Sequence, residues 1–328
     1  MRILVTGASG FLGVALVRKL STAKHNIRAV RHDSKPSELS IPNVETVVGD
    51  ICDPRRVRDI TNGCQVIVHL AARVHTIGNH NVDYEAVNVE GTRHVLDAAV
   101  ESGVSRVIFV SSVKVFGEET RGCVDETQAL APQTPYGRSK LRAEQLVTGY
   151  ARQHGFTAVS LRLPMVYGLT RKGNLFRMLD AINRERFPIL PRLSAMRSLL
   201  HVENFVQAVL LCLRAPGFTR AAYIVADSKP YCMTDLYDGL RAGLGKAPPR
   251  WRVPLWVLKA GARCGDLFEV LTKKYAPFST DQLTKLIGDA WYSPAAITRE
   301  LGYQPLYSFE KTVPELIAFY RHSIGVKP

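Results

Sequence analysis

The chain has 328 residues and a formal net charge of +14, and its six cysteines include no CxxC pair. The length suits one large or two modest domains, and the scattered cysteines fit a reducing compartment better than a disulfide framework. No apolar run is long enough to span a bilayer, and the first one begins at Ile3, too early to follow a signal peptide, so we expect a cytoplasmic protein.

The positive charge favours an anionic partner, because the summed charge of a protein steers association. The basic residues are dispersed along the chain and form no nucleic-acid-binding module, so we expect a small anionic ligand and no nucleic acid. The histidines have no zinc-ligand spacing, and His75 and His80 lie in a predicted loop, so we expect no metal site.

A strand, a glycine turn and a helix open the chain. Residues 3–5 are apolar and predict a buried strand, and residues 11–20 have apolar side chains at helical spacing. Gly7 permits the tight turn between them, Gly10 lets the backbone approach a pyrophosphate, and Gly13 lets the helix lie close on the strand. The backbone N–H groups and the dipole at the helix start attract phosphates, so this stretch predicts a dinucleotide site.

The alternation of strands and helices continues beyond this turn. Apolar runs predict strands at 27–30, 44–48, 65–72, 107–112 and 158–163, with helices at 84–100 and 135–154. Crossover connections of this kind give an α/β protein with a Rossmann-like, doubly wound parallel sheet, here a dinucleotide-binding domain over 1–165. Past residue 166 the pattern predicts helices near 174–183, 202–213, 234–244 and 309–321, and a strand near 222–226 that returns to the sheet. Residues 166–328 therefore form a smaller, interleaved substrate lobe.

Tyr136 and Lys140 are four residues apart on a predicted helix, so their side chains share one face. A tyrosine is a weak acid, and a nearby ammonium is expected to lower the pKa of Tyr136 and let it exchange a proton with a hydroxyl or carbonyl group. Ser112 ends a predicted strand at the carboxyl edge of the sheet, where a hydroxyl can hold the reacting oxygen. These residues predict a catalytic group.

The sequence resembles the extended short-chain dehydrogenase/reductases, specifically the nucleotide-sugar epimerases, dehydratases and reductases of bacterial surface-polysaccharide synthesis. The matching segments cover the first half of the chain closely and the second half in short stretches. They are 6–13, 49–51, 69–72, Tyr84 with 88–92, 110–117, 136–140, 163–168, 173–175, 197–202 and 301–305.

The resemblance implies a role for each matching residue. Tyr136 is the expected general acid/base, Lys140 binds the nicotinamide ribose and tunes Tyr136, and Ser112 is the catalytic hydroxyl that also touches the substrate. Asn174 and Arg197 are expected to hold the diphosphate of the substrate, and a guanidinium suits phosphate. Besides Tyr136 and Lys140, the implied cofactor-binding residues are Gly7, Ser9, Gly10, Phe11, Leu12, Gly13, Arg31, Asp50, Ile51, Leu70, Ala71, Ala72, Asn88, Pro164 and Val166.

Arg31 departs from the pattern of the NAD-preferring members, which place an acid at the end of the second strand. An arginine at this position accommodates a 2′-phosphate, so the sequence favours NADP(H). Asp33, two residues further on, keeps NAD(H) open as the alternative.

The implied reaction is hydride transfer at C4 of a nucleotide-diphosphate sugar. We expect an NADPH-dependent reductase of a UDP-4-keto-6-deoxy sugar, with a 4-epimerase of a UDP-sugar or a polyprenyl-diphosphate-linked sugar as the alternative. Val113 and Lys114 stand where the dehydratases of the family carry an acidic pair, which disfavours a dehydratase. A ketone or steroid reductase and a non-catalytic dinucleotide-binding protein remain further alternatives.

Residues 251–275 combine tryptophans, leucines and a phenylalanine with Lys259, Arg263, Lys273 and Lys274. This composition suits a helix that packs in the substrate lobe, and it also suits an amphipathic helix that contacts an anionic membrane peripherally. The resemblance also implies a homodimer, formed through the helices that carry Tyr84 and Tyr136.

Overall fold

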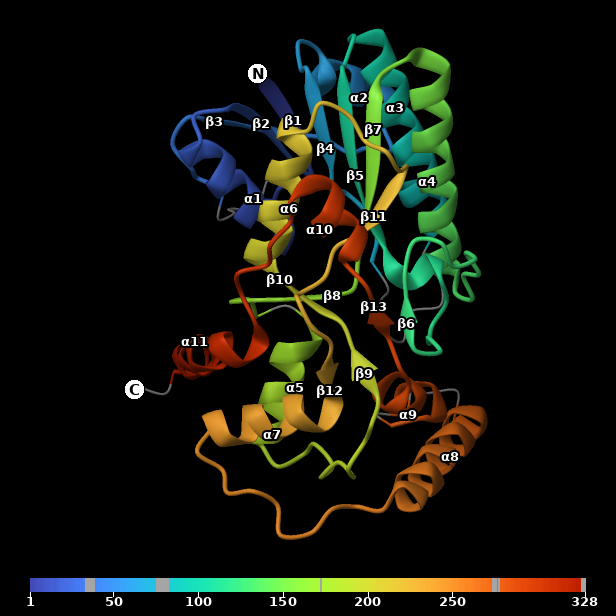
Figure 1. Ribbon diagram of the computed structural model, residues 1–328, viewed down its shortest axis with the longest axis vertical. Coiled ribbons are helices and arrows are strands. Elements are labelled where there is room, and N and C mark those ends of the chain that lie inside the picture. The colour runs from blue at the N-terminus through green and yellow to red at the C-terminus, as the bar shows by residue number, and fades with distance from the viewer. Residues whose placement is uncertain (33–38, 75–82, 172, 273–275, 277, 326–328) are drawn as a thin grey trace.

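The computed structural model describes residues 1–328 apart from 33–38, 75–82, 172, 273–275, 277 and 326–328. Its centre is a seven-stranded sheet in the order β11-β7-β5-β4-β1-β2-β3, with all neighbours parallel (Figure 1). The strands are β1 (Arg2–Thr6), β2 (Asn26–Arg31), β3 (Val44–Val48), β4 (Val66–His69), β5 (Arg106–Ser112), β7 (Thr157–Leu163) and β11 (Ala222–Ile224). The predicted Rossmann-like, doubly wound sheet is confirmed.

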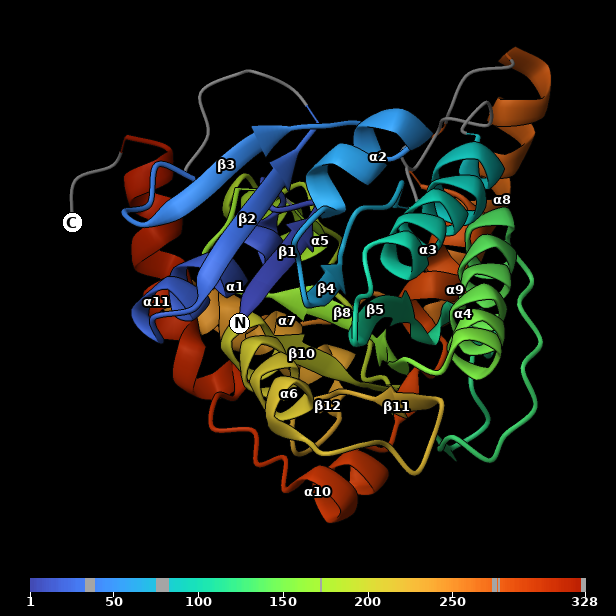
Figure 2. The ribbon, with the colours of Figure 1, turned by 90° about the horizontal axis from the view of Figure 1, so that it is seen from above.

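Helices cover both faces of the sheet, which is why the central strands β1 and β4 are buried almost throughout (Figure 2). On one face α1 (Phe11–Thr22) and α6 (Val202–Arg214) bury a cluster that includes Leu16 and Val209. On the other face lie α2 (Pro54–Thr61), α3 (Gly91–Glu101) and α4 (Pro135–His154), with Val57, Val95 and Val147 in the core. A π-helix, η1 (Glu85–Glu90), leads into α3, and a 3-10 turn, η2 (Val113–Val115), follows β5.

Most of the remaining elements form a smaller lobe below the carboxyl edge of the sheet (Figure 1). Its main core joins α5 (Asn174–Asn183), α7 (Met233–Gly243) and α11 (Phe309–Ser323). A second, small core joins α8 (Leu255–Thr272) to α9 (Thr280–Ile287). Short strands tie the lobe together: β8 (Met165–Tyr167) pairs with β10 (Leu199–His201), β9 (Met196–Arg197) with β12 (Tyr231–Cys232), and β6 (Cys123–Val124) with β13 (Trp291–Tyr292).

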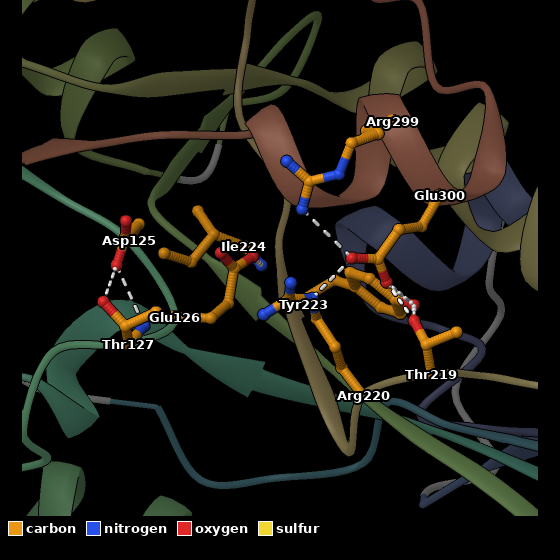
Figure 3. A network of polar contacts seen from close by, with 9 residues as sticks. All are labelled: Asp125, Glu126, Thr127, Thr219, Arg220, Tyr223, Ile224, Arg299 and Glu300. Carbon is orange, nitrogen blue, oxygen red and sulfur yellow. Dashed lines mark hydrogen bonds and ion pairs between the residues drawn. The ribbon is translucent and has the colours of Figure 1, made fainter.

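The edge strand β11 is covered by polar groups from distant segments (Figure 3). The backbone N–H of Ile224 donates to Oε1 of Glu126 at 2.7 Å, which satisfies an edge donor that would otherwise invite another strand. Glu300, on α10 (Ala295–Leu301), accepts hydrogen bonds from Thr219, Arg220 and Tyr223. These hydrogen bonds, that of Thr219 above all, lower the pKa of Glu300 to about 2.

A carboxylate with a depressed pKa stabilises the fold above its unfolded pKa, and that contribution is lost as the pH falls through the folded pKa. We expect Glu300→Gln to lower the free energy of unfolding by roughly 2 kcal/mol at pH 7, the contribution typical of hydrogen bonds to a charged group. The difference from the unmodified protein should shrink as the pH falls below about 4.5, the unperturbed value. Urea unfolding at neutral and acidic pH measures it.

The matched control is Glu101→Gln, which breaks the exposed ion pair with Arg58 and should cost little at either pH. An equal loss for Glu300→Gln at both pH values would contradict the linkage.

Candidate active site

The first part of the site is the point where the strand order reverses, between β1 and β4. Thr6 at the end of β1 is paired with His69 at the end of β4, and ligands of doubly wound sheets bind in the crevice beyond such strand ends. Gly7 has a φ of +67°, and a Cβ there would lie 2.7 Å from the backbone nitrogen of Ala71. Gly7 therefore has to be glycine for two reasons, its conformation and the close approach of residues 70–71.

The start of α1 has the features of a phosphate cradle. A Cβ on Gly13 would lie 2.4 Å from the carbonyl oxygen of Gly7, so the helix sits directly on the turn. Gly10 is the N-cap, no side chain caps the helix, and its first turn contains no acidic residue. The backbone N–H groups around Phe11 and Leu12 and the helix dipole therefore suit an anion, and the geometry fits the pyrophosphate of a dinucleotide. Ser9 lies in the same turn, half-buried.

A buried network behind the turn fixes the residues that end β4. Nδ1 of His69 lies 2.6 Å from the Thr6 hydroxyl, and Nε2 lies 3.0 Å from the Thr92 hydroxyl. The Thr92 hydroxyl donates its hydrogen to the carbonyl of Asn88, so it accepts a hydrogen bond from Nε2–H of His69. The Thr6 hydroxyl donates to Nδ1 of His69 and accepts the backbone N–H of Ala71. Burial lowers the pKa of His69 to about 3, so the ring is neutral, as this assignment requires. Sequence reasoning missed Thr6, His69 and Thr92 as a positioning unit.

The side chain of Asn88 is held by hydrogen bonds within the protein. It is buried on η1, where its amide nitrogen donates to the carbonyl of Arg73 and to the hydroxyl of Ser139, and its oxygen accepts the N–H of Arg73. The side chain thus links the segment that follows β4, with Leu70, Ala71 and Ala72, to helix α4. Asn88 is therefore placed to hold one wall of the cofactor crevice in position.

The remaining candidates for cofactor binding lie at the ends of β2 and β3. Arg31 is the last residue of β2, half-buried, at the same carboxyl edge as Thr6. Asp50 follows β3, and its Oδ1 accepts the N–H of Cys52 at 2.9 Å. Ile51 is buried against α3, where a Cβ on Gly91 would lie 2.7 Å from its Cδ1. Asp33, on which the NAD(H) alternative rests, lies outside the described residues, as does the neighbouring Lys35.

The candidate catalytic hydroxyls lie next to each other, at the end of β5 and the start of α4. The Tyr136 hydroxyl lies next to Ser112, and the Tyr84 ring packs edge-on against the Tyr136 ring at 5.9 Å between centroids. Ser112 ends β5 and also accepts the N–H of Lys114 at 3.2 Å. Burial raises the pKa of Tyr136 to about 12, which the hydrogen bond with Ser112 only partly offsets. The phenol is therefore held in its protonated form.

Lys140 lies one turn beyond Tyr136 on α4 and is only 3% exposed. Its Nζ donates to the carbonyl of Val110 at 2.9 Å and lies 4.8 Å from the centroid of the Phe109 ring. Burial lowers the pKa of Lys140 to about 8, while the nearby charge of Glu144 raises it. The expectation that Lys140 lowers the pKa of Tyr136 is wrong for this structure, because desolvation of the phenol outweighs any such attraction.

Gly137 sets the distance between the two candidate catalytic segments, a role that sequence reasoning did not assign to it. A Cβ there would lie 2.6 Å from the carbonyl oxygen of Lys114 in η2 and 3.1 Å from Cβ of Pro132. We expect Gly137→Ala to push the start of α4 away from η2 and to separate Tyr136 from Ser112. A misplacement of about 1 Å can cost about 10²-fold in kcat.

The control for this substitution is Gly149→Ala, further along α4, where an added Cβ meets nothing within 4 Å. It should keep full activity and stabilise the helix by about 1 kcal/mol. Steady-state kinetics of the two variants measure the effect, and an unchanged kcat for Gly137→Ala would refute the positioning role.

A buried ion pair beneath α4 is a second feature that the sequence did not reveal. Glu144 and Arg162 are each 7% exposed, and the guanidinium reaches the carboxylate through Nε at 3.1 Å and through Nη2 at 2.7 Å. Arg162 lies on β7 directly beside Ser111 of β5 and stacks over the Phe116 ring. The pair fixes α4 to the sheet one turn beyond Lys140.

The segment after β7 leads from the cofactor crevice into the second lobe. Pro164 is buried and Val166 is half-buried in β8, which pairs with β10. A Cβ on Gly168 would lie 3.0 Å from the tip of the Phe11 ring, so this segment closes over the start of α1. Pro164 and Val166 therefore lie on the side of the crevice that faces the second lobe.

The two candidate substrate residues come from separate elements of the second lobe. Asn174 is exposed at the start of α5. Arg197 is half-buried on β9, and its Nη2 donates to the carbonyl of Gly288 at 2.8 Å. Burial lowers the pKa of Arg197. Among the described residues no group of three or more potential metal ligands is found, and His75 and His80 lie outside them.

The chain is similar to known proteins over most of its length. A model described as the NAD dependent epimerase/dehydratase family matches residues 3–226. A UDP-glucose 4-epimerase of Vibrio cholerae is 30% identical, with 92% of this chain and 90% of the relative aligned. A 2-alkyl-3-oxoalkanoate reductase of Stenotrophomonas maltophilia is 28% identical, with 97% and 99% aligned.

Among solved structures, a UDP-glucose 4-epimerase of Thermotoga maritima with UDP-glucose has the same fold. It superposes with a TM-score of 0.80 at 21% identity, covering 99% of this chain and 100% of the other. The family model spans more than half of the chain and includes the glycine turn, Ser112, Tyr136 and Lys140. The chain therefore belongs to the NAD dependent epimerase/dehydratase family of enzymes.

Proposed function

We propose that the protein catalyses the NADPH-dependent reduction of a C4 ketone on a nucleotide-diphosphate sugar. The observation that carries this proposal is the position of Tyr136 at the start of α4, beside Ser112 at the end of β5 and one turn from Lys140. A reduction adds one hydride and one proton to the carbonyl group. A phenol held protonated by burial is suited to supply that proton.

Each catalytic residue has a defined part in this step. A reduced nicotinamide, when bound, supplies the hydride to C4. The Ser112 hydroxyl holds the C4 oxygen, and the Tyr136 O–H gives its proton to that oxygen, which leaves a phenolate. The Lys140 ammonium, one turn along the same helix face, stabilises the negative charge that develops on Tyr136. The products are the C4 alcohol and the oxidised nucleotide.

Arg31 supports NADP(H) as the cofactor, because it lies at the end of β2, the position from which a side chain can bind a ribose 2′-phosphate. We expect Arg31→Asp to weaken NADPH binding by about tenfold or more, since a charge-assisted contact to phosphate is lost and repulsion is introduced. NADH binding should be unchanged or tighter. Fluorescence titration of the reduced cofactors measures the ratio, and an NADPH affinity unaffected by the substitution would exclude this role.

A 4-epimerase is the second candidate, and the observation that favours it is the similarity to the Vibrio cholerae protein described as a UDP-glucose 4-epimerase. An epimerase returns the hydride to the other face of C4, so the cofactor is not consumed. The similarity to an oxoalkanoate reductase keeps a non-sugar ketone as a further substrate class. Arg197 on β9 supports a diphosphate, because a half-buried guanidinium suits phosphate better than an apolar chain.

The test is the cofactor balance with a panel of UDP-sugars, UDP-4-keto-6-deoxy sugars and 3-oxoalkanoates. Consumption of one NADPH for each 4-keto sugar supports the reductase. Interconversion of UDP-sugar isomers without net consumption of the cofactor would show that the protein is an epimerase and not a reductase. Turnover of the 3-oxoalkanoates alone would show that the substrate is a non-sugar ketone and not a nucleotide sugar.

A further inference from the structure

Helix α8 (Leu255–Thr272) lies at the end of the second lobe, far from the central sheet (Figure 1). Only Leu258 and Ala262 are buried, and they pack with Leu283 of α9 in a small core of their own. The helix thus packs in the lobe through one narrow side, and most of its surface has no cover among the residues that the structure describes.

The outward surface of α8 is apolar. Trp256 is 72% exposed and Leu271 is 73% exposed, and Val257, Leu267 and Phe268 are exposed as well. The spacing of Trp256, Leu267 and Leu271 places them on one side of the helix, opposite Leu258 and Ala262. Trp251, just before the helix, is also 64% exposed. Large apolar side chains gathered on one surface mark an interaction site more often than the same residues scattered singly.

The charged residues of α8 are divided between its two sides. Asp266 accepts the N–H of Thr280 at 2.9 Å, and Glu269 accepts the N–H of Ala276 at 2.8 Å, so both carboxylates are directed at the segment that follows the helix. Lys259 and Arg263 are exposed and border the apolar side. The outward surface of α8 thus presents apolar groups and cations, while its carboxylates are used within the protein.

We propose that α8, with Trp251, is a docking surface for an anionic lipid bilayer. Tryptophan and leucine side chains enter the boundary between headgroups and acyl chains, and lysine and arginine contact the anionic headgroups. The net charge of +14 adds to this attraction. A second copy of the chain fits the surface less well, because a symmetric contact would bring the same cations together. No helix among the described residues could cross a bilayer, so the contact is peripheral.

The test is flotation of the full-length protein with vesicles of phosphatidylcholine alone or mixed with phosphatidylglycerol. We expect binding to the anionic vesicles, with a blue shift of tryptophan fluorescence, and release at high salt. Trp256→Gln with Leu267→Gln should abolish binding, whereas Leu306→Gln, which removes another exposed leucine, should not.

Lys259→Gln with Arg263→Gln should weaken binding about 25-fold, since each cation near an anionic surface contributes about fivefold (about 1 kcal/mol). The control for net charge is Lys229→Gln with Lys311→Gln, which lowers the charge equally outside α8 and should weaken binding far less. Absence of vesicle binding would overturn the proposal, and so would equal binding to both kinds of vesicle. A dimer that dissociates on the Trp256 and Leu267 substitutions, without vesicle binding, would assign the surface to self-association instead. None of these outcomes depends on the proposed reaction, because no substrate is used.

Discussion

Replacing Tyr136 by phenylalanine should lower kcat by about 10²- to 10⁴-fold, the range typical of losing a positioned proton donor. The substitution keeps the ring that packs against Tyr84 and removes only the hydroxyl that lies next to Ser112. The fold and the cofactor crevice at the ends of β1 and β4 should be unaffected. Steady-state kinetics with the reduced cofactor and a ketone substrate measure the loss.

Cofactor affinity is the necessary control for this variant, because it separates lost chemistry from lost binding. The dissociation constant of NADPH should stay within about threefold, since no phosphate-binding group is changed. Full turnover by Tyr136→Phe would exclude Tyr136 as the proton donor. Full biological function without turnover would support the alternative of a non-catalytic dinucleotide-binding protein.

Replacing Glu144 by glutamine should lower the free energy of unfolding by about 3–5 kcal/mol, because it leaves the buried guanidinium of Arg162 without its counter-charge. The double substitution Glu144→Leu with Arg162→Met removes both charges and should recover most of that loss. Urea unfolding at neutral pH measures both variants. A Glu144→Gln variant within about 0.5 kcal/mol of the parent would show that the pair contributes little.

The same substitution has a second readout that a purely structural role would not move. Burial lowers the pKa of Lys140 to about 8 and the charge of Glu144 raises it, so removing that charge should lower it further. In the proposed reaction, Lys140 supports the developing phenolate only while it is protonated. Activity should therefore fall as the pH rises through about 8 in the parent protein, and at a lower pH in Glu144→Gln. A pH profile that is the same in both proteins would show that the charge of Glu144 does not affect activity through the pKa of Lys140.

Local patterns were sufficient to predict the sheet and the helix that carries Tyr136 and Lys140. The strands of the sheet are apolar runs, the glycine turn has a specific spacing, and Tyr136 and Lys140 share a helix face. Helix α2 was missed although its start signals are present: Asp53 accepts the N–H groups of Arg55 and Arg56, and Pro54 occupies the first turn. Its few apolar residues gave no clear period.

Contacts between distant segments could not be predicted in this way. The neutral state of His69 results from its burial, and the orientation of its ring depends on hydroxyls from Thr6 and Thr92, which lie on other elements. The raised pKa of Tyr136 depends on how much protein surrounds the phenol, which no spacing reports. The strand predicted over 65–72 ends at His69 because the following residues turn to pack against Gly7. Each of these features arises only when the chain is folded.

The most direct test of the central claim is the transfer of deuterium from [4-²H]NADPH to the substrate. With a UDP-4-keto-6-deoxy sugar, mass spectrometry and proton NMR of the product should show one deuterium at C4 for each NADPH oxidised. The label should not appear at C4 with Tyr136→Phe on the same timescale. A sugar product with hydrogen at C4 and an unconsumed cofactor would contradict the account and identify internal hydride return, the signature of an epimerase.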